Sequence, residues 1–354
     1  MVENFTIIGT SSSRTESRQI AIWLLICCAV VFAMVVLGGL TRLTHSGLSM
    51  VDWKPLTGWL PPLSSEAWQL EFENYQRFPE YQKLNQGMTL AEFKSIFWFE
   101  FSHRLLGRGI GVLFFVPFLY FLLSRKIDRG LLPKLLFMFV LGGLQGVLGW
   151  WMVKSGLLER PDVSHYRLTA HLGLAVLIFG YMLSVAVTLL VPKAVIVDDR
   201  LRGLGRFGLV MTLVVFVVIL SGGLVAGLDA GFAYNTFPLM DGRLVPEGLF
   251  DHAPWYINPL ENLITIQFDH RWLAVATLLA VVALWQHALR RGVTGSLRTA
   301  FHLVLVVAAI QVGLGIATLV LVVPVALAAL HQAGALLLFS VIVIAAQLTR
   351  QAAG

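Results

Sequence analysis

Apolar residues fill this chain in long runs rather than in the short alternating patterns of a water-soluble protein. A helix that crosses a bilayer needs about 20 apolar residues, and eight stretches satisfy that requirement. They cover residues 20–41, 101–123, 134–153, 168–191, 207–228, 269–289, 299–321 and 326–347. Because a segment in hydrocarbon must satisfy its own backbone hydrogen bonds, helices are the expected form. The pattern predicts an all-α integral membrane protein with eight transmembrane helices.

The overall composition agrees with lipid as the main solvent. The 354 residues are 57% hydrophobic and 13% charged, which leaves too few polar side chains to cover a water-soluble surface. The first apolar stretch is too long for a cleaved signal sequence, so we interpret it as a retained helix. The tail before it contains Glu3 and Glu16, whereas mitochondrial transit peptides avoid acidic residues. A bacterial cytoplasmic (inner) membrane is therefore the expected location.

The positive charges indicate how the chain is oriented. Lys and Arg concentrate in the N-terminal tail and in three short connections, at residues 124–134, 192–206 and 290–298. Acidic residues are more frequent in the longer connections on the opposite side. By the positive-inside rule, the basic connections and both termini face the cytoplasm. The same distribution explains the net charge of +6 without nucleic acid as a partner.

The sequence repeats itself once. Four landmarks recur in the same order, at offsets of 184, 167, 166 and 160 residues: Gly38-Gly39-Leu40 with Gly222-Gly223-Leu224, His103-Arg104 with His270-Arg271, Gln145 and Gly149 with Gln311 and Gly315, and His171 with His331. The repeat predicts a cytoplasmic tail (1–19), an N-terminal half (20–191), a cytoplasmic linker (192–206) and a C-terminal half (207–348). Each half has four helices, so both insert in the same orientation as tandem, pseudo-symmetric four-helix bundles.

Four histidines occupy equivalent places in the repeat. They fall near the starts of helices that enter from the outer side, about one turn (~5 Å) below the interface: His103, His171, His270 and His331. An ionisable residue inside a membrane is costly and is a functional candidate. A single one is often a packed, hydrogen-bonded histidine, but four at one depth favour a shared ligand. Neutral imidazole suits heme iron, and a helix N-terminus disfavours the protonated form.

The residues around these histidines limit the choice of ligand. Zinc is less suitable, because each pair lacks a cysteine and offers too few ligands, and the only cysteines, Cys27 and Cys28, are adjacent in the first helix. Arg104 and Arg271 follow the first histidine of each pair, where they can bind heme propionates. The alternative for both arginines is contact with lipid headgroups.

The two halves differ beside the first histidine. Glu100 aligns with Gln267, three residues before the histidine and on the same side of the helix, where a carboxylate can exchange protons or stabilise positive charge. The alternative is a carboxylate favoured by the helix dipole. The segment after the first helix also differs, since Arg42 and His45 align with Ala226 and Asp229. We therefore expect the first half to bind an exchangeable substrate heme and the second to retain a heme b.

At these residues the chain resembles the heme A synthases over nearly its whole length. The resemblance rests on Gly38-Gly39-Leu40-Thr41-Arg42-Leu43-Thr44 with Ser46-Gly47-Leu48-Ser49, on Glu100-x-x-His103-Arg104, on Asn235-Thr236-Phe237-Pro238-Leu239-Met240-Asp241-Gly242, and on His331-Gln332-x-Gly334-Ala335. It implies oxidation of a methyl group of heme O to the formyl group of heme A, with heme b as cofactor. It also implies that His103 and His171 flank the substrate heme, that His270 and His331 ligate heme b, and that Glu100 is the essential acid.

The resemblance further implies heme O synthase and cytochrome oxidase assembly factors as partners. Some members carry a cysteine pair in the outer loops, which this chain lacks, so it resembles the cysteine-free branch typical of proteobacteria and mitochondria. Any redox role of that pair cannot operate here. The sequence leaves open the electron donor, the source of the formyl oxygen and the number of copies that assemble, a homo-oligomer included.

Two other functions compete with heme A synthesis. An electron-transfer cytochrome with two permanent b hemes would use the same histidines, but the Glu100/Gln267 difference argues against it. A solute transporter with parallel repeats would be expected to show broken helices at the bilayer midplane. Pro117 is the only clear helix-breaking residue in the middle of a predicted helix, and it has no counterpart in the sixth helix.

Overall fold

The computed structural model describes residues 11–53, 57–156, 162–191 and 201–353. Eight of its helices are long and apolar enough to cross a membrane: α1 (Ser11–Leu43), α4 (Leu90–Leu123), α5 (Leu132–Gly156), α6 (His165–Leu190), α7 (Arg202–Gly227), α9 (Leu263–Arg290), α10 (Gly295–Val320) and α11 (Val325–Ala353). The all-α, eight-helix prediction is thus confirmed. The predicted tail and linker fall partly outside the described residues, at 1–10 and 192–200.

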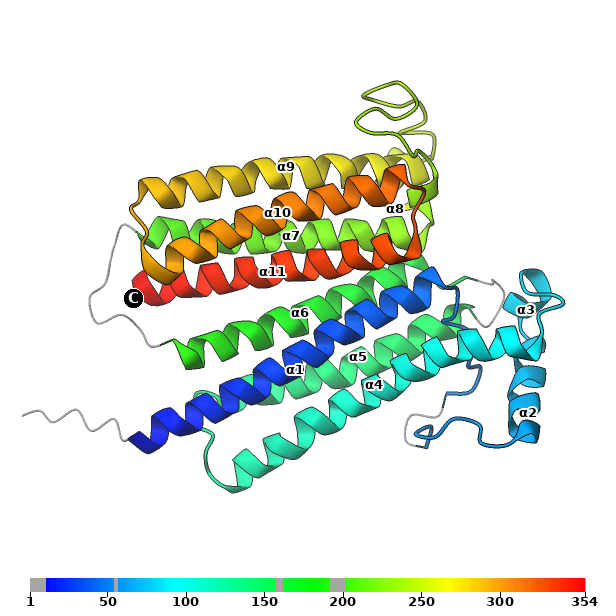
Figure 1. The fold of residues 1–354 in the computed structure, drawn as a ribbon, viewed down its shortest axis with the longest axis horizontal. Coiled ribbons are helices and arrows are strands. Elements are labelled where there is room, and N and C mark those ends of the chain that lie inside the picture. The colour runs from blue at the N-terminus through cyan, green and yellow to red at the C-terminus, as the bar shows by residue number, and fades with distance from the viewer. Residues whose placement is uncertain (1–10, 54–56, 157–161, 192–200, 354) are drawn as a thin grey trace, which may run out of the picture.

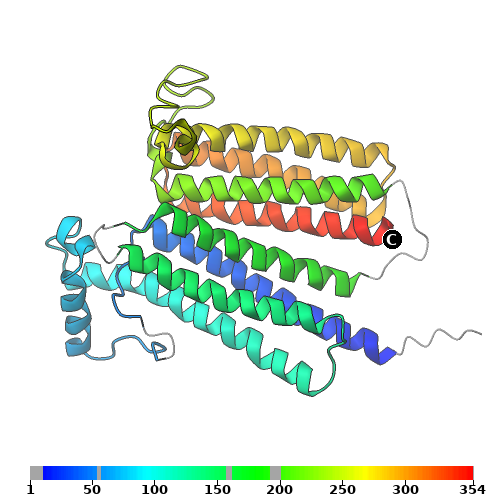
Figure 2. The same cartoon turned by 180° about the vertical axis from the view of Figure 1, so that it is seen from behind.

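The spanning helices lie in two groups of four (Figure 1). One group contains α1, α4, α5 and α6, and the other contains α7, α9, α10 and α11. Where the groups meet, α6 contacts both α7 and α11, and α1 contacts α11. The start of α1 and the end of α11 lie at the same end of the bundle, as Figure 2 also shows from behind. The predicted symmetry between the two groups stays a prediction.

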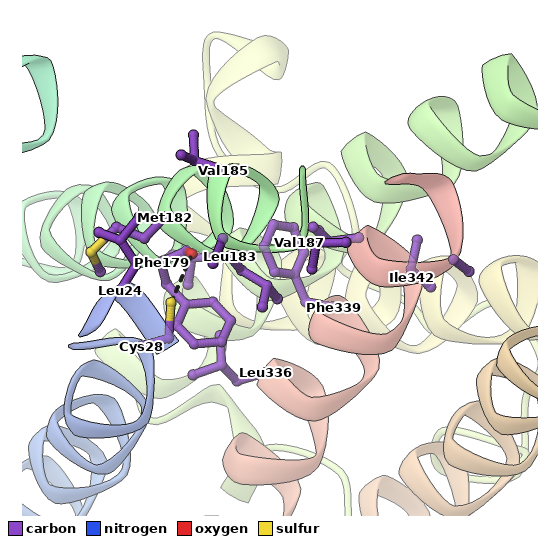
Figure 3. Close-up of a cluster of buried hydrophobic side chains, with 14 of the residues drawn as sticks. Leu24, Cys28, Phe179, Met182, Leu183, Val185, Val187, Leu336, Phe339 and Ile342 are labelled. Carbon is purple, nitrogen blue, oxygen red and sulfur yellow. Dashed lines mark hydrogen bonds between the residues drawn. The ribbon is translucent and has the colours of Figure 1, made fainter. Parts of the chain in front are cut away.

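The centre of the molecule is an apolar core where α1, α6 and α11 meet (Figure 3). Phe339 of α11 packs directly over Gly180 of α6, where a Cβ atom would lie 2.7 Å from the phenyl ring. Cys28 lies 3.9 Å from the carbonyl oxygen of Phe179, and both Cys27 and Cys28 are buried and free. Close packing of this kind, rather than the hydrophobic effect, holds helices together in lipid.

Short helices cover one end of the bundle, which the sequence predicts to be the outer end. Between α1 and α4 lie α2 (Ser65–Gln76) and α3 (Pro79–Lys83). Between α7 and α9 lie η2 (Ala230–Phe232), η3 (Trp255–Ile257) and α8 (Asn258–Glu261). Figure 1 shows both segments at the end opposite the start of α1. The segment with α2 contacts α4, and the segment with η2 and α8 contacts α9, so each adjoins a helix that carries a histidine.

Helix α4 begins at Leu90, well before the predicted start at residue 101. The side chain of Thr89 accepts a hydrogen bond from the backbone N–H of Glu92, and Glu92 in turn accepts one from Thr89, which is a capping box. The added turns pack Phe93 of α4 against Phe72 of α2, with ring centroids 5.1 Å apart. Helix α1 also begins early, at Ser11 rather than at residue 20.

This early start corrects the predicted place of one histidine along its helix, while the depth predicted for it in the membrane stays a prediction. His103 lies more than three turns after the first residue of α4, whereas His171, His270 and His331 lie about two turns into α6, α9 and α11. The prediction that all four lie near helix starts was therefore wrong for His103. Since the effect of a helix N-terminus falls off within the first turn, it does not act on any of the four imidazoles, contrary to the expectation from the sequence.

Candidate heme sites

All of the predicted site residues line one cavity between the two groups of helices. The cavity has a volume of about 1110 Å³, and its walls include residues of both halves. It contains the four histidines together with Glu100, Arg104 and Arg271. Small-molecule sites usually measure about 300–1,000 Å³, so this cavity has room for a large, mostly apolar ligand.

In the second half the histidine pair has the spacing of two axial ligands. The ring centroids of His270 and His331 are 6.3 Å apart, and the ring planes are nearly perpendicular, at 88°. Two metal–nitrogen bonds of about 2 Å, together with roughly 1 Å from each nitrogen to its ring centre, span about 6 Å. The separation of the rings therefore suits two imidazoles that would hold one iron ion, and the apolar lining of the cavity suits a porphyrin.

Polar and small neighbours hold these two rings. Ser221 Oγ lies 2.8 Å from His270 Nδ1, and Gln311 Nε2 lies 3.1 Å from His331 Nδ1 while also donating to the His331 carbonyl oxygen. Each ring also lies against a glycine. A Cβ atom at Gly222 would lie 3.2 Å from the His270 ring, and one at Gly315 would lie 2.8 Å from the His331 ring. The repeated glycines of the sequence thus make room for imidazoles.

The histidines of the first half are held differently. Gln145 donates to the His171 carbonyl oxygen at 3.0 Å, but its side chain faces the Nε2 atom of the ring, at 3.4 Å. The Nδ1 atom of His171 is buried without a hydrogen-bond partner among the described residues. For His103, the Nε2 atom faces α1, since it would lie 3.1 Å from a Cβ atom at Gly38.

Glu100 is part of a buried polar network rather than a free acid. Its Oε2 atom accepts hydrogen bonds from Ser49 Oγ at 2.8 Å and from the Met50 backbone N–H at 2.6 Å. Its Oε1 atom accepts one from Arg104 at 2.5 Å. The side chain is 3% exposed. Arg104 also donates to the carbonyl oxygens of Met50 and Asp52, both at 2.7 Å, so the pair fixes the segment that follows α1.

Arg271 makes the corresponding contacts in the second half. It donates to the carbonyl oxygens of Tyr234 at 2.5 Å and of Thr236 at 2.7 Å, which align with those of Met50 and Asp52 at the offset of 184. Gln267 donates to the same Tyr234 oxygen at 3.1 Å. The Nε atom of Arg271 is buried and has no partner in the described part of the chain. Sequence reasoning expected both arginines to bind propionates, and this Nε–H group is a donor of Arg271 that the described residues leave unused.

The residues that differ between the halves after the first helix contact each other. Arg42 donates to Asp229 at 2.8 Å, which joins the two halves by an ion pair at the edge of the cavity. A second link runs from Gln332 Nε2 to the Val35 carbonyl oxygen, at 2.8 Å. The sequence showed Arg42 and Asp229 only as positions that differ between the halves. The fold shows that these two residues form an ion pair.

Sequence reasoning missed a buried carboxyl group in the outer segment. Glu80 of α3 lines the cavity and is 5% exposed, and its Oε2 atom accepts a hydrogen bond from Tyr75 at 3.0 Å. Asn85 donates to the Tyr75 oxygen at 2.7 Å. Burial raises the pKa of Glu80 to about 8, and the negative charges of Glu100 and Asp162 add to the rise. No sequence motif includes Glu80, and its burial depends on the position of α3 in the folded chain.

Comparisons with known proteins agree with the motifs. The model of the cytochrome oxidase assembly protein family matches residues 21–343. The heme A synthase of Nitrosospira multiformis is 54% identical over 332 residues, which cover 94% of this chain and 93% of the relative. The heme A synthase of Nitrosomonas eutropha is 53% identical over 333 residues, which cover 93% and 94%. Because similarity of this strength extends over nearly the whole chain, the protein belongs to the heme A synthase family of cytochrome oxidase assembly proteins.

Proposed function

We propose that this protein makes heme A by oxidising a methyl substituent of heme O to a formyl group, through successive hydroxylations. The observation that carries the proposal is the similarity over nearly the full chain to relatives named heme A synthase. The shared cavity with two unlike histidine pairs supports it, because an enzyme that modifies one heme with the help of another needs two different sites.

In the second half, His270 and His331 hold heme b as a resident cofactor. Their spacing and perpendicular planes support this assignment, and Arg271 contacts a propionate through its remaining Nε–H group. A b-type heme, when bound, supplies one-electron chemistry to the reaction. The surrounding residues keep the imidazoles in place and exclude water from the apolar part of the cavity.

In the first half, His103 and His171 bind heme O as the substrate. Arg104 fixes the segment that follows α1 and presents positive charge to the propionates. Glu100 is the acidic group of this site, and it accepts a proton or stabilises positive charge while the methyl substituent is oxidised. When Glu100 takes up a proton, Arg104 still has two backbone carbonyl oxygens as partners, so the segment keeps its place.

The proposed setting is the cytoplasmic membrane of a bacterium, with both termini in the cytoplasm and the heme sites toward the outer side. The segments with α2, α3 and α8 then lie on the outer side. A heme O synthase delivers the substrate, the farnesyl chain extends into lipid, and cytochrome oxidase assembly receives the product. Oxidation of the methyl group to a formyl group requires an oxidant that takes up four electrons, and if this oxidant is molecular oxygen, which hydroxylates the group, an electron donor must supply further electrons.

The test is to extract hemes from membranes of a host that produces heme O, with and without this protein. Heme A is expected only in membranes that contain the protein. If well-aerated, well-expressing cells contain two protein-bound b hemes but no heme A, the protein is an electron-transfer cytochrome. A His103→Ala variant separates the sites further, since it should abolish heme A while the heme b bound by the second half remains.

A further inference from the structure

The two histidine pairs have the same ligands but different supporting groups. Ser221 of α7 lies beside His270, whereas the residue that aligns with Ser221 at the offset of 184 is Leu37. A leucine side chain offers His103 no hydrogen bond. The difference lies directly before the repeated Gly-Gly pair, and so at the same place in both halves.

The contacts of Ser221 decide which nitrogen of His270 carries the proton. Ser221 Oγ donates to the Val218 carbonyl oxygen at 2.8 Å and lies 2.8 Å from His270 Nδ1. A hydroxyl group has one hydrogen, and a carbonyl oxygen can only accept. Both contacts are hydrogen bonds at once only when the His270 Nδ1–H donates to Ser221. The Nε2 atom then keeps its lone pair, as a metal ligand requires.

The other histidine of the second half is held at the same ring atom. Gln311 contacts Nδ1 of His331 at 3.1 Å through its amide nitrogen, which donates, so Nδ1 accepts this hydrogen bond and the contact does not prepare Nε2 as a ligand. In the first half the corresponding glutamine, Gln145, faces Nε2 of His171 instead. Among these contacts, only that of Ser221 with His270 leaves a ring with a free lone pair on Nε2.

We propose that Ser221 is a positioning residue that fixes His270 for ligation through Nε2 and makes the second half the site that keeps its heme. Leu37 leaves the first half without this support, and the heme bound there stays exchangeable. The inference rests on the proposed function, because it takes His270 and His331 as the ligands of the resident heme b. It adds the reason why two sites with the same ligands behave differently.

Loss of the Ser221 hydroxyl has two expected consequences. A hydrogen bond from the distal ring nitrogen orients an imidazole ligand and raises its basicity, and removing such a partner typically lowers metal affinity about 10- to 100-fold. Heme b should therefore leave Ser221→Ala faster by about that factor. A more basic imidazole also favours the ferric ion, so the midpoint potential of heme b should rise when the hydroxyl is lost.

The experiment uses the purified full-length protein in detergent. Transfer of heme b to excess apomyoglobin gives the rate of loss, and a redox titration of the b-type absorbance gives the potential. Ser221→Thr keeps the hydroxyl and should restore both values. Ser340→Ala is the matched control, since Ser340 of α11 donates to the Leu336 carbonyl oxygen and contacts no histidine. Leu37→Ser should slow loss of heme from the first half.

The outcomes separate this inference from the proposed function. If Ser221→Ala keeps the wild-type rate of heme loss and the wild-type potential, the inference is overturned, while heme A synthesis stands. If Ser340→Ala changes both values as much as Ser221→Ala does, the effect is one of general packing and the inference is equally overturned. Wild-type protein without b-type heme, or without heme A production from heme O, would instead remove the proposed function.

Discussion

Replacing Glu100 by glutamine changes the charge of the candidate acid and almost nothing of its shape. The second half already contains this arrangement, because Gln267 occupies the aligned position next to Arg271. A glutamine beside this arginine is therefore compatible with the fold. The variant separates the chemical role of the carboxylate from its role in packing.

The contacts of Glu100 give the loss of stability that Glu100→Gln should cause. Hydrogen bonds to a charged group contribute about 1.5–3 kcal/mol, and removing one member of a buried ion pair costs about 3–5 kcal/mol. The amide oxygen of glutamine can still accept from Ser49 and Met50, and Arg104 keeps its two carbonyl partners. Only the contact between residue 100 and Arg104 is lost, so we expect a local cost of about 2 kcal/mol.

The effect on activity should be much larger. General acid–base catalysis contributes about 10²- to 10⁴-fold, so heme A formation by Glu100→Gln should fall at least 100-fold. The heme b content should stay at the wild-type level, because Glu100 belongs to the first half. The assay compares extracted heme O, heme A and heme b in membranes with equal amounts of protein, and hydrogen exchange of residues 49–52 reports the structural cost.

A matched control removes a carboxylate that does not reach the cavity. Glu73 of α2 is exposed and contacts Gln69 on the same helix, so Glu73→Gln should keep full activity. Heme A formation by Glu100→Gln within a few-fold of the wild-type level would refute the catalytic role. The carboxylate would then serve only to fix Arg104 and the segment that follows α1.

Three further predictions concern other residues of the cavity. Burial holds the pKa of Glu80 at about 8, above its ordinary value of 4.5, so the folded protein keeps a proton that the unfolded chain loses first. The protection of α2 and α3 against hydrogen exchange, corrected for the intrinsic rise of amide exchange with pH, should therefore fall as pH rises from about 5 through 8, and Glu80→Gln should remove this fall. Gly315→Ala should displace the His331 ring and lower heme b content, whereas Gly313→Ala, which meets open space, should not. Arg271→Ala should weaken heme b retention in the purified protein, and unchanged retention would exclude a propionate contact.

Most of the framework of this protein could be predicted from its sequence, because length and hydropathy alone define helices in lipid. The repeat then assigned the four histidines to equivalent helices, and the cavity brings them together. The prediction failed for the distance of His103 from the start of its helix. A capping box at Thr89 and an aromatic contact between α2 and α4 extend the helix outward, and neither is visible to a search for apolar runs.

The contacts that hold the histidines were harder to predict than the histidines themselves. Arg104 and Arg271 donate to backbone carbonyl oxygens of distant segments. Because every residue has a carbonyl group, the sequence does not indicate which one an arginine will contact. Ser221 did leave a signal, since the aligned repeat has a serine opposite Leu37 beside the same Gly-Gly pair. A polar-to-apolar exchange at one position of a repeat is the kind of difference that alignment of the two halves can find.

Two heme sites on one scaffold must meet opposite requirements, since one must retain its heme and the other must release a product. Changing a ligand would alter the iron chemistry as well as the affinity, whereas changing a supporting hydrogen bond alters mainly the affinity. A tenfold difference in affinity corresponds to about 1.4 kcal/mol, which is the size of one buried hydrogen bond. The hydroxyl group of Ser221, which Leu37 lacks, can therefore account for about a tenfold difference in heme affinity between the two proposed sites.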